Sequence, residues 1–340
     1  MPDRGAFVIS AGRCGSTMLS DLLATHPSVL AIQELMHSVQ PSGLGTGTCT
    51  GAQFWRVLSG PAELAATLKR IGLSLPQFRY RGARRVPGDP YAVPRVLATT
   101  LPALTNDPDR LFDELSDEVP RFPEQPIPAH YHTLFGLLAE RIGRPRWIER
   151  SGGSSVFAAS LVRMFPDARY VYLTRDPFDA AVSMSKHPGF LLLEVRSMFV
   201  RRCGVDPYQA GAGPFRRPVP DDLQPVLPDA LTPASLTARG GDLRNFILMW
   251  AYMCRLAEAA LALVPADRVL RMRYEDLLND PANELARLAA ALDLPDGPAW
   301  AARAAGRVIR QGPGLPPGDP RRAELRELVE RVAPALSKQS

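Results

Sequence analysis

The chain has 340 residues and a formal net charge of +5, with 46% hydrophobic and 22% charged residues. This composition predicts a globular protein that is neither disordered nor membrane-spanning, and it allows one large domain or two smaller ones. The basic residues are almost all arginines and form no dense block, so the charge does not predict nucleic-acid binding.

The cysteines and apolar runs predict a cytoplasmic protein. The four cysteines lack the paired spacing of a zinc or redox site and are predicted to be free thiols: Cys14, Cys49, Cys203 and Cys254. The first apolar run begins at residue 6, too early for the apolar region of a secretion signal. The longest apolar run, 246–264, contains Arg255 and Glu258, which favours a buried amphipathic helix over a membrane span.

Strand and helix patterns alternate along the chain. Short runs rich in β-branched and aromatic residues predict strands at 6–10, 29–32, 146–148, 170–174 and 269–272. Helical patterns follow at 17–24, 131–142, 155–165, 178–186, 243–263 and 281–292. Asp280 is a plausible N-cap for the last of these helices, with Pro281 at its first position. The alternation predicts an α/β fold, a central parallel sheet flanked by helices.

Two segments rich in Gly and Pro, 37–129 and 204–240, interrupt this alternation. Long irregular segments of this kind are typical of lids and substrate walls, so we expect irregular and helical insertions that bind the acceptor or cover the site, within a single domain 1–340. The first segment offers aromatic side chains either for an apolar or ring-bearing acceptor or for a small core of its own: Phe54, Trp55, Phe78, Tyr80 and Tyr91.

The segment "FVISAGRCGSTMLSDLL", residues 7–23, runs from a strand through a turn of small residues into a helix. Such a turn directs backbone N–H groups and a helix N-terminus at one point, which favours an anion. Arg13 adds a charge and Thr17 a hydroxyl. A tight connection without a ligand is the alternative. The lysine of a nucleotide-hydrolysing loop is absent, and Ser16 stands in its place.

A second segment, "TRDPFDAAVS", places Arg175 and Asp176 at the carboxyl end of a predicted strand. Open α/β sheets bind ligands at that edge. Arg175 and Ser183 on the following helix could hold a second phosphate, whereas Arg175 and Asp176 could instead pair at the surface.

Together, "GRCGST" and "TRDPFDAAVS" resemble the two cofactor motifs of the sulfotransferases that use 3′-phosphoadenosine 5′-phosphosulfate (PAPS). The resemblance is closest to the branch of tyrosylprotein and many bacterial sulfotransferases, and it covers 6–35, 146–187 and 243–293. It implies a P-loop-like sulfotransferase fold. It also implies that the first loop binds the 5′-phosphosulfate, with contacts from Arg13, Cys14, Gly15, Ser16 and Thr17.

The resemblance further implies that Arg175 and Ser183 bind the 3′-phosphate and that Tyr274 contacts the adenine. The resemblance also implies Arg310 as a further 3′-phosphate contact, in a segment without the Lys and Trp that the family commonly has there. Cys14 replaces the usual Ser, and its position beside Arg13 at a helix N-terminus suggests a lowered pKa.

Three residues are candidates for catalysis. In the sulfotransferase branch that this sequence resembles, a basic residue at the position of Arg13 stabilises the charge on the departing oxygen. A glutamate at the spacing of Glu34 is the general base. Arg150 stands where that branch has a second catalytic Lys. His130 and His132 are acceptor-pocket candidates only. The arrangement requires no metal.

The resemblance therefore predicts a PAPS-dependent sulfotransferase that acts on a hydroxyl or amine of an organic acceptor. We expect this acceptor to be a small apolar or sugar-containing metabolite and not a protein. A P-loop kinase or nucleotide hydrolase and a catalytically silent binding protein of the same fold remain alternatives. Neither the acceptor nor the oligomeric state follows from the sequence.

Overall fold

Five strands pair in one parallel sheet in the computed structural model, which describes residues 5–209, 211–309, 314–316 and 318–333. Their order across the sheet is β2-β5-β1-β6-β7. Their bounds agree closely with the predicted strands: β1 Ala6–Ser10, β2 Val29–Gln33, β5 Arg146–Arg150, β6 Arg169–Thr174 and β7 Val269–Arg273. The predicted parallel sheet is confirmed.

The sheet register aligns the carboxyl ends of the strands at one edge. Gln33 of β2 lies opposite Arg150 of β5, and Ser10 of β1 lies opposite Leu173 of β6. β1 is central, and the chain leaves it toward β2 on one side and reaches β6 on the other later in the sequence. This is a topological switch point, where ligands of open α/β sheets bind.

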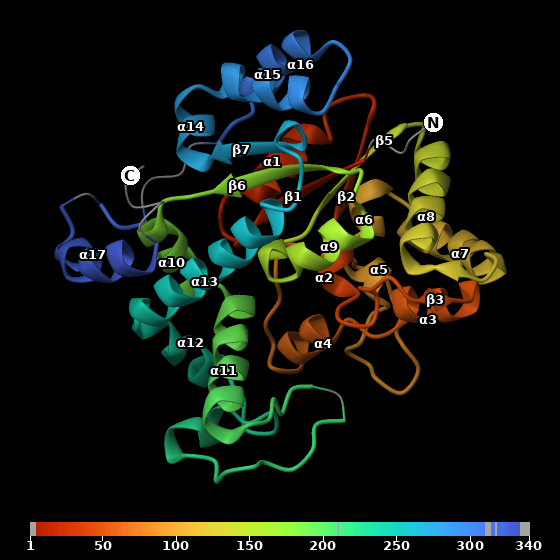
Figure 1. Cartoon of the computed structure of the whole chain (residues 1–340). Coiled ribbons are helices and arrows are strands. Elements are labelled where there is room, and N and C mark those ends of the chain that lie inside the picture. The colour runs from red at the N-terminus through yellow and green to blue at the C-terminus, as the bar shows by residue number, and fades with distance from the viewer. Residues whose placement is uncertain (1–4, 210, 310–313, 317, 334–340) are drawn as a thin grey trace. The chain divides into compact units, whose positions relative to one another are not determined.

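The chain divides into two compact units. Unit 1 comprises Met1–Ala62, Gln77–Asp176 and Tyr252–Gly312 and contains the sheet. Its helices include α1 Ser16–Leu23, α2 Leu35–Ser38, α3 Gly51–Ser59, α5 Arg95–Ala98, α6 Leu101–Leu104, α7 Pro108–Glu118, α8 Ile127–Ile142, α9 Ala158–Met164, α14 Tyr274–Asn279, α15 Pro281–Ala291 and α16 Gly297–Ala305. Figure 1 shows α14, α15 and α16 following β7 in the chain.

The 3₁₀ turns of unit 1 are η1 Val119–Arg121, η2 Ser154–Phe157 and η5 Ala266–Arg268, and a small antiparallel pair joins β3 Thr48–Cys49 to β4 Gln125–Pro126. The predicted helix at 155–165 therefore begins with the 3₁₀ turn η2. Asp280 caps α15 as predicted, since its side chain accepts a hydrogen bond from Asn283 N.

Unit 2 comprises Glu63–Pro76, Pro177–Ala251 and Pro313–Ser340. Its described elements are helical: α4 Glu63–Arg70, α10 Pro177–Ser185, α11 Pro188–Cys203, η3 Asp221–Val226, α12 Pro233–Thr237, η4 Ala238–Gly241 and α17 Pro320–Val332. Helix α13, Leu243–Leu261, begins in unit 2 and ends in unit 1. The single-domain organisation stays a prediction.

The predicted insertion 37–129 contributes to the main hydrophobic core of unit 1. Phe54 and Tyr80 are buried in the same cluster as Phe7 of β1, and Trp55 packs against that cluster. Tyr91 is exposed. Phe54, Trp55 and Tyr80 thus pack as core side chains, which was the alternative to an acceptor wall.

Candidate active site

The carboxyl edge of the sheet brings together five of the predicted site residues, all in unit 1. Each strand end is associated with one of them, and the strand order gives their order along the edge: Glu34, Arg150, Arg13, Arg175 and Tyr274. These residues are up to 261 positions apart in the sequence, from Arg13 to Tyr274. Parallel pairing places them at one edge because all five strands run in the same direction.

The loop after β1 has an unusual backbone. Gly12, Arg13 and Gly15 have φ angles of 81°, 56° and 81°, and α1 begins at Ser16 as predicted. A left-handed conformation is uncommon for an arginine and is over-represented at ligand-binding sites. Successive N–H groups in such a turn, together with the first N–H groups of a helix, form an anion-binding concavity.

Positive charge is concentrated at this loop. Arg13 is exposed by surface area, yet the surrounding protein displaces enough water from its guanidinium to lower its pKa. The charges of Arg175 and Arg150 lower the pKa of Arg13 further. Arginine stays charged at neutral pH despite such a shift, so Arg13 and Arg175 repel each other and favour an anion between them, whereas the charge of Arg150 is paired with Glu34.

Arg175 and Tyr274 pack under the loop. The Arg175 guanidinium carbon lies 4.7 Å from the centroid of the Tyr274 ring, and its Nη1 donates a hydrogen bond to Arg13 O at 3.1 Å. A Cβ on Gly15 would lie 2.3 Å from the same ring, so only glycine fits there. The Tyr274 side chain contacts the loop directly, and the residue is 4% exposed. The contact of Tyr274 with an adenine stays a prediction.

Glu34 and Arg150 form a buried ion pair. Glu34 follows β2 with a left-handed φ of 58°, and its Oε1 accepts a hydrogen bond from Arg150 Nη1. Its Oε2 accepts from Gly152 N at 3.0 Å. Arg150 is 1% exposed and also donates to Gln33 Oε1 at 3.3 Å. Both carboxylate oxygens are therefore fixed in position. A general base needs a fixed position, because it must lie within hydrogen-bond distance of the proton that it removes.

The pKa expectation for Cys14 is wrong. The side chain is fully buried, and its Sγ donates to Gly12 O at 3.1 Å. Burial raises the pKa of the thiol, with a further contribution from Cys254, and outweighs the nearby charge of Arg175. Exposure differs along the loop: Thr17 is exposed, whereas Ser16 is buried.

The two histidines lie in the aromatic core of unit 1. His130 is fully buried, with Nε2 bonded to Cys49 O at 2.8 Å and Nδ1 to Gln125 Nε2 at 3.2 Å. Its ring stacks on Phe54. His132 contacts Phe165 edge to face. Both ring nitrogens of His130 are therefore occupied, and its interactions are those of a structural residue.

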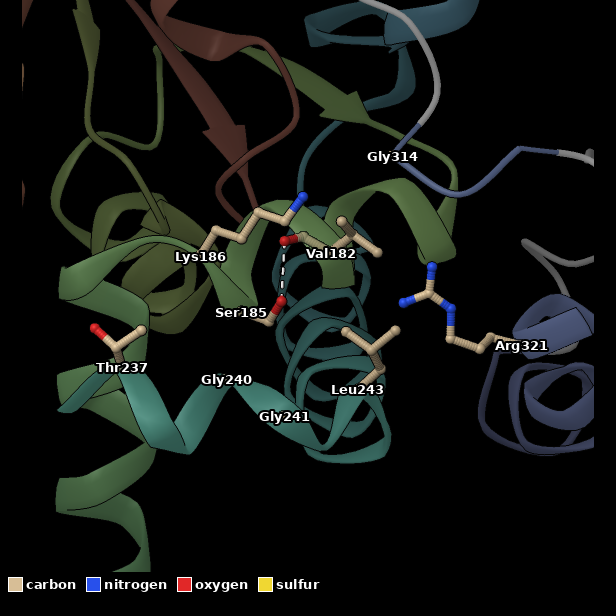
Figure 2. Close-up of a pocket in the computed structure, with 9 residues that line it drawn as sticks. All are labelled: Val182, Ser185, Lys186, Thr237, Gly240, Gly241, Leu243, Gly314 and Arg321. Atoms are coloured by element: carbon tan, nitrogen blue, oxygen red, sulfur yellow. Dashed lines mark hydrogen bonds between the residues drawn. The ribbon is translucent and has the colours of Figure 1, made fainter. Parts of the chain in front are cut away.

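Two predicted contacts are not among the described residues of unit 1. Ser183 is half-buried on α10 in unit 2, and Arg310 lies outside the described residues. Unit 2 also contains a cavity of about 350 Å³, shown in Figure 2, with Lys186 from the end of α10 and Arg321 from α17 in its lining. Arg321 is paired with Asp319 at 2.7 Å. The net charge of the cavity lining is therefore that of one exposed lysine, Lys186. This charge alone does not identify a ligand.

The end of β5 and the segment after it contain site residues that sequence reasoning missed. Glu149 and Ser151 are fully buried, and Gly152 donates its N–H to Glu34. Their signal in the sequence was a run of polar residues, "ERSG", directly after the predicted strand 146–148. In the described part of the chain, no group of three or more His, Cys, Asp or Glu is placed to hold a metal ion. No helix there is long and apolar enough to cross a membrane.

A comparison with protein families adds independent evidence. The model described as "Sulfotransferase family" matches residues 228–298. In this segment the chain resembles the sulfotransferase family. The match includes β7, α14 and Tyr274, and it covers the whole of 243–293, the last of the three segments on which the sequence resemblance was based. The predicted resemblance to sulfotransferases is confirmed, and it supports transfer of a sulfuryl group in general.

Solved sulfotransferase structures are similar to this chain over most of its length. The sulfotransferase domain from the Curacin biosynthetic pathway is 17% identical, with a TM-score of 0.48, covering 94% of this chain and 81% of that chain. STF9 from Mycobacterium avium is 16% identical, with a TM-score of 0.43, covering 97% and 76%. Retinol dehydratase in a complex with retinol and PAP is 15% identical, with a TM-score of 0.36, covering 98% and 81%. No curated protein sequence gave a significant match.

Proposed function

We propose that this protein transfers a sulfuryl group from PAPS to a hydroxyl or amine of a small organic acceptor. The observation that carries the proposal is the pair of arginines at the loop after β1: Arg13 lies in the left-handed turn, and Arg175 Nη1 donates a hydrogen bond to Arg13 O at 3.1 Å. Two arginines beside a left-handed turn and a helix N-terminus fit a polyanionic donor. PAPS, when bound, supplies an activated sulfuryl group on a phosphate that can leave.

The loop after β1 has the features needed to bind the phosphosulfate. Its left-handed residues, Gly12, Arg13 and Gly15, precede α1, so backbone N–H groups and the helix dipole act on the same anion. Arg13 adds a positive charge that would stabilise the negative charge developing on the bridging oxygen. Cys14, Ser16 and Thr17 complete the proposed contacts, with Cys14 acting through its backbone because its thiol is buried.

Glu34 is the proposed general base. As the acceptor oxygen or nitrogen attacks the sulfur, the S–O bond to the nucleotide breaks and the acceptor proton passes to the Glu34 carboxylate. Arg150 and Gly152 N hold that carboxylate in one orientation. Alignment and charge stabilisation then supply the catalysis, as in phosphoryl transfer.

The remaining donor contacts are proposals carried by the family resemblance. Arg175 lies beside the loop and is suited to a phosphate. Ser183 and Arg310 are further proposed contacts of the 3′-phosphate, and Tyr274 of the adenine. The proposed acceptor is a small metabolite, and its binding residues are unassigned.

The donor is tested by thermal unfolding with 3′-phosphoadenosine 5′-phosphate (PAP) and, separately, with ATP and Mg²⁺. A ligand at 100 times its Kd stabilises a protein by about 2.7 kcal/mol, so PAP should raise the Tm by several degrees and ATP with Mg²⁺ should not. Arg175→Ala should weaken PAP by about tenfold or more, whereas the exposed Arg163→Ala should leave PAP binding unchanged.

Equal Tm shifts with both nucleotides, or none with either, would contradict a PAPS donor. Equal shifts would favour a kinase or nucleotide hydrolase. A screen of hydroxyl and amine acceptors with ³⁵S-labelled PAPS then tests turnover. A protein that binds PAP and transfers label to none of them would be the catalytically silent alternative.

A further inference from the structure

The segment 149–152, Glu-Arg-Ser-Gly, contacts the region of Glu34 in two different ways. Arg150 and Gly152 bind the Glu34 carboxylate. Glu149 and Ser151 instead bind the backbone that follows Glu34. Glu149 Oε1 accepts a hydrogen bond from Met36 N at 3.2 Å, and Ser151 Oγ accepts one from His37 N at 2.9 Å. Successive side chains at a strand end point in opposite directions, which explains this alternation.

Glu34 depends on these contacts for its conformation. Its left-handed backbone is unfavourable for a residue with a Cβ and persists only where the surroundings enforce it. The helix that follows, α2, has only four residues, Leu35–Ser38, and is too short to be stable by itself. Its first N–H groups have no carbonyl partners within the helix, and the side chains of Glu149 and Ser151 supply acceptors for two of them.

The two side chains are also linked to each other. Ser151 Oγ donates its only proton to Glu149 Oε1 at 2.6 Å, so the hydroxyl must accept from His37 N. Glu149 Oε2 is buried and has no hydrogen-bond partner among the described residues. Burial of a carboxyl group is costly for stability unless its oxygens are hydrogen-bonded.

We propose that Glu149 and Ser151 are positioning residues for the reaction, which hold the start of α2 and thereby set the Glu34 carboxylate toward the acceptor. The proposal rests on Glu34 as the base of the proposed function. Glu149 acts through Oε1, which remains an acceptor whether or not Oε2 carries a proton. Burial raises the pKa of Glu149 to about 7, the charge of Glu34 raises it as well, and Ser151, Met36 N and Arg150 oppose the rise.

The test compares variants that remove the acceptors with one that keeps an acceptor. Glu149→Leu and Ser151→Ala each remove an acceptor, whereas Glu149→Gln retains one for Met36 N. The control is Tyr170→Phe, which removes another fully buried hydroxyl of unit 1, one that donates to Leu161 O and Phe165 O. Each variant is measured by amide hydrogen exchange at Met36 and His37, by kcat and KM for PAPS, and by the Tm shift with PAP.

We expect Glu149→Leu to expose the Met36 amide and Ser151→Ala the His37 amide to about tenfold faster exchange or more, because a lost acceptor opens the first turn. The same variants should lose about 10- to 100-fold in kcat, with the KM for PAPS and the Tm shift unchanged, since a misplacement of about 1 Å has that effect. Glu149→Gln should keep most of the turnover, and Tyr170→Phe all of it.

Two results would overturn the proposal. The first is a wild-type kcat in Glu149→Leu and Ser151→Ala when Glu34→Gln is inactive, since the base would then need no such support. The second is an equal loss of kcat in Tyr170→Phe, which would indicate a general effect of a weakened core. A fully active Glu34→Gln is a separate outcome that overturns the base itself, so failure of the two proposals can be distinguished.

Discussion

The loops after β1 and β5 follow adjacent strands at the same edge of the sheet. Each is associated with an arginine, but the two arginines have opposite environments. Arg13 in the first loop is exposed, in a left-handed turn that also contains Gly12 and Gly15. Arg150 at the second is 1% exposed and is already paired with Glu34. The comparison teaches that one edge contains both a cation presented to a ligand and a cation used to fix a carboxylate.

The largest expected effect concerns the buried pair. Glu34→Gln should lower kcat by about 10²- to 10⁴-fold, because an amide cannot take the acceptor proton. It should also lower the free energy of unfolding by about 3–5 kcal/mol, because Arg150 keeps its buried charge without a counterion. Turnover of ³⁵S-labelled PAPS and chemical denaturation measure the two effects, and PAP should still raise the Tm.

The matched control for Glu34→Gln is Glu284→Gln. Glu284 is another largely buried glutamate of unit 1 with an arginine partner, Arg287, at 2.6 Å, and it lies on α15. We expect its kcat to stay at the wild-type value. If Glu34→Gln retains most of its turnover, the base lies elsewhere, and Glu34 belongs with Arg150 as a structural ion pair.

A smaller effect is expected at the exposed loop. Gly15→Ala combines a φ of 81° with a Cβ that would lie 2.3 Å from the Tyr274 ring. Gly143→Ala has a similar φ of 71° and no atom within 4 Å of the new Cβ. The left-handed backbone costs about 1–2 kcal/mol in both, and displacement of the ring adds about 1–3 kcal/mol only in Gly15→Ala.

Urea denaturation of the two glycine variants measures this difference in the free energy of unfolding. Gly15→Ala should also lose the Tm shift with PAP, because the loop must move with the ring. Equal losses of stability in the two variants would show that Tyr274 does not restrain the loop.

The smallest effect is expected for the cysteines. Burial raises the pKa of Cys14, and Cys203 and Cys254 are buried as well, whereas Cys49 is half-buried. Iodoacetamide at pH 7.5 should therefore label Cys49 before the three buried cysteines in the folded protein. The rate at which Cys49 is labelled should not depend on Cys14. Peptide mass spectrometry locates the label. First modification at Cys14 would mean that the loop opens far enough to expose its thiol.

Much of the fold followed from local patterns. The five buried runs became the five strands, and "GRCGST" became a left-handed turn before a helix that begins at Ser16. Short helices such as α5 and α6 in the Pro-rich segment were not predicted, because four residues carry no clear periodicity. The burial of His130 between aromatic rings could not be predicted from local patterns either, because its stacking partner Phe54 is 76 positions away in the sequence.

The sequence by itself determined the alternation of strands and helices, and with it the residues that follow each strand, because hydrophobic period and turn chemistry are local properties. Only the tertiary structure decided which of these residues meet. Parallel pairing with Gln33 opposite Arg150 places Glu34 against Arg150 and Gly152. It also decided that Cys14 is buried rather than activated, because desolvation depends on every element packed around a group and not on its neighbours in the chain.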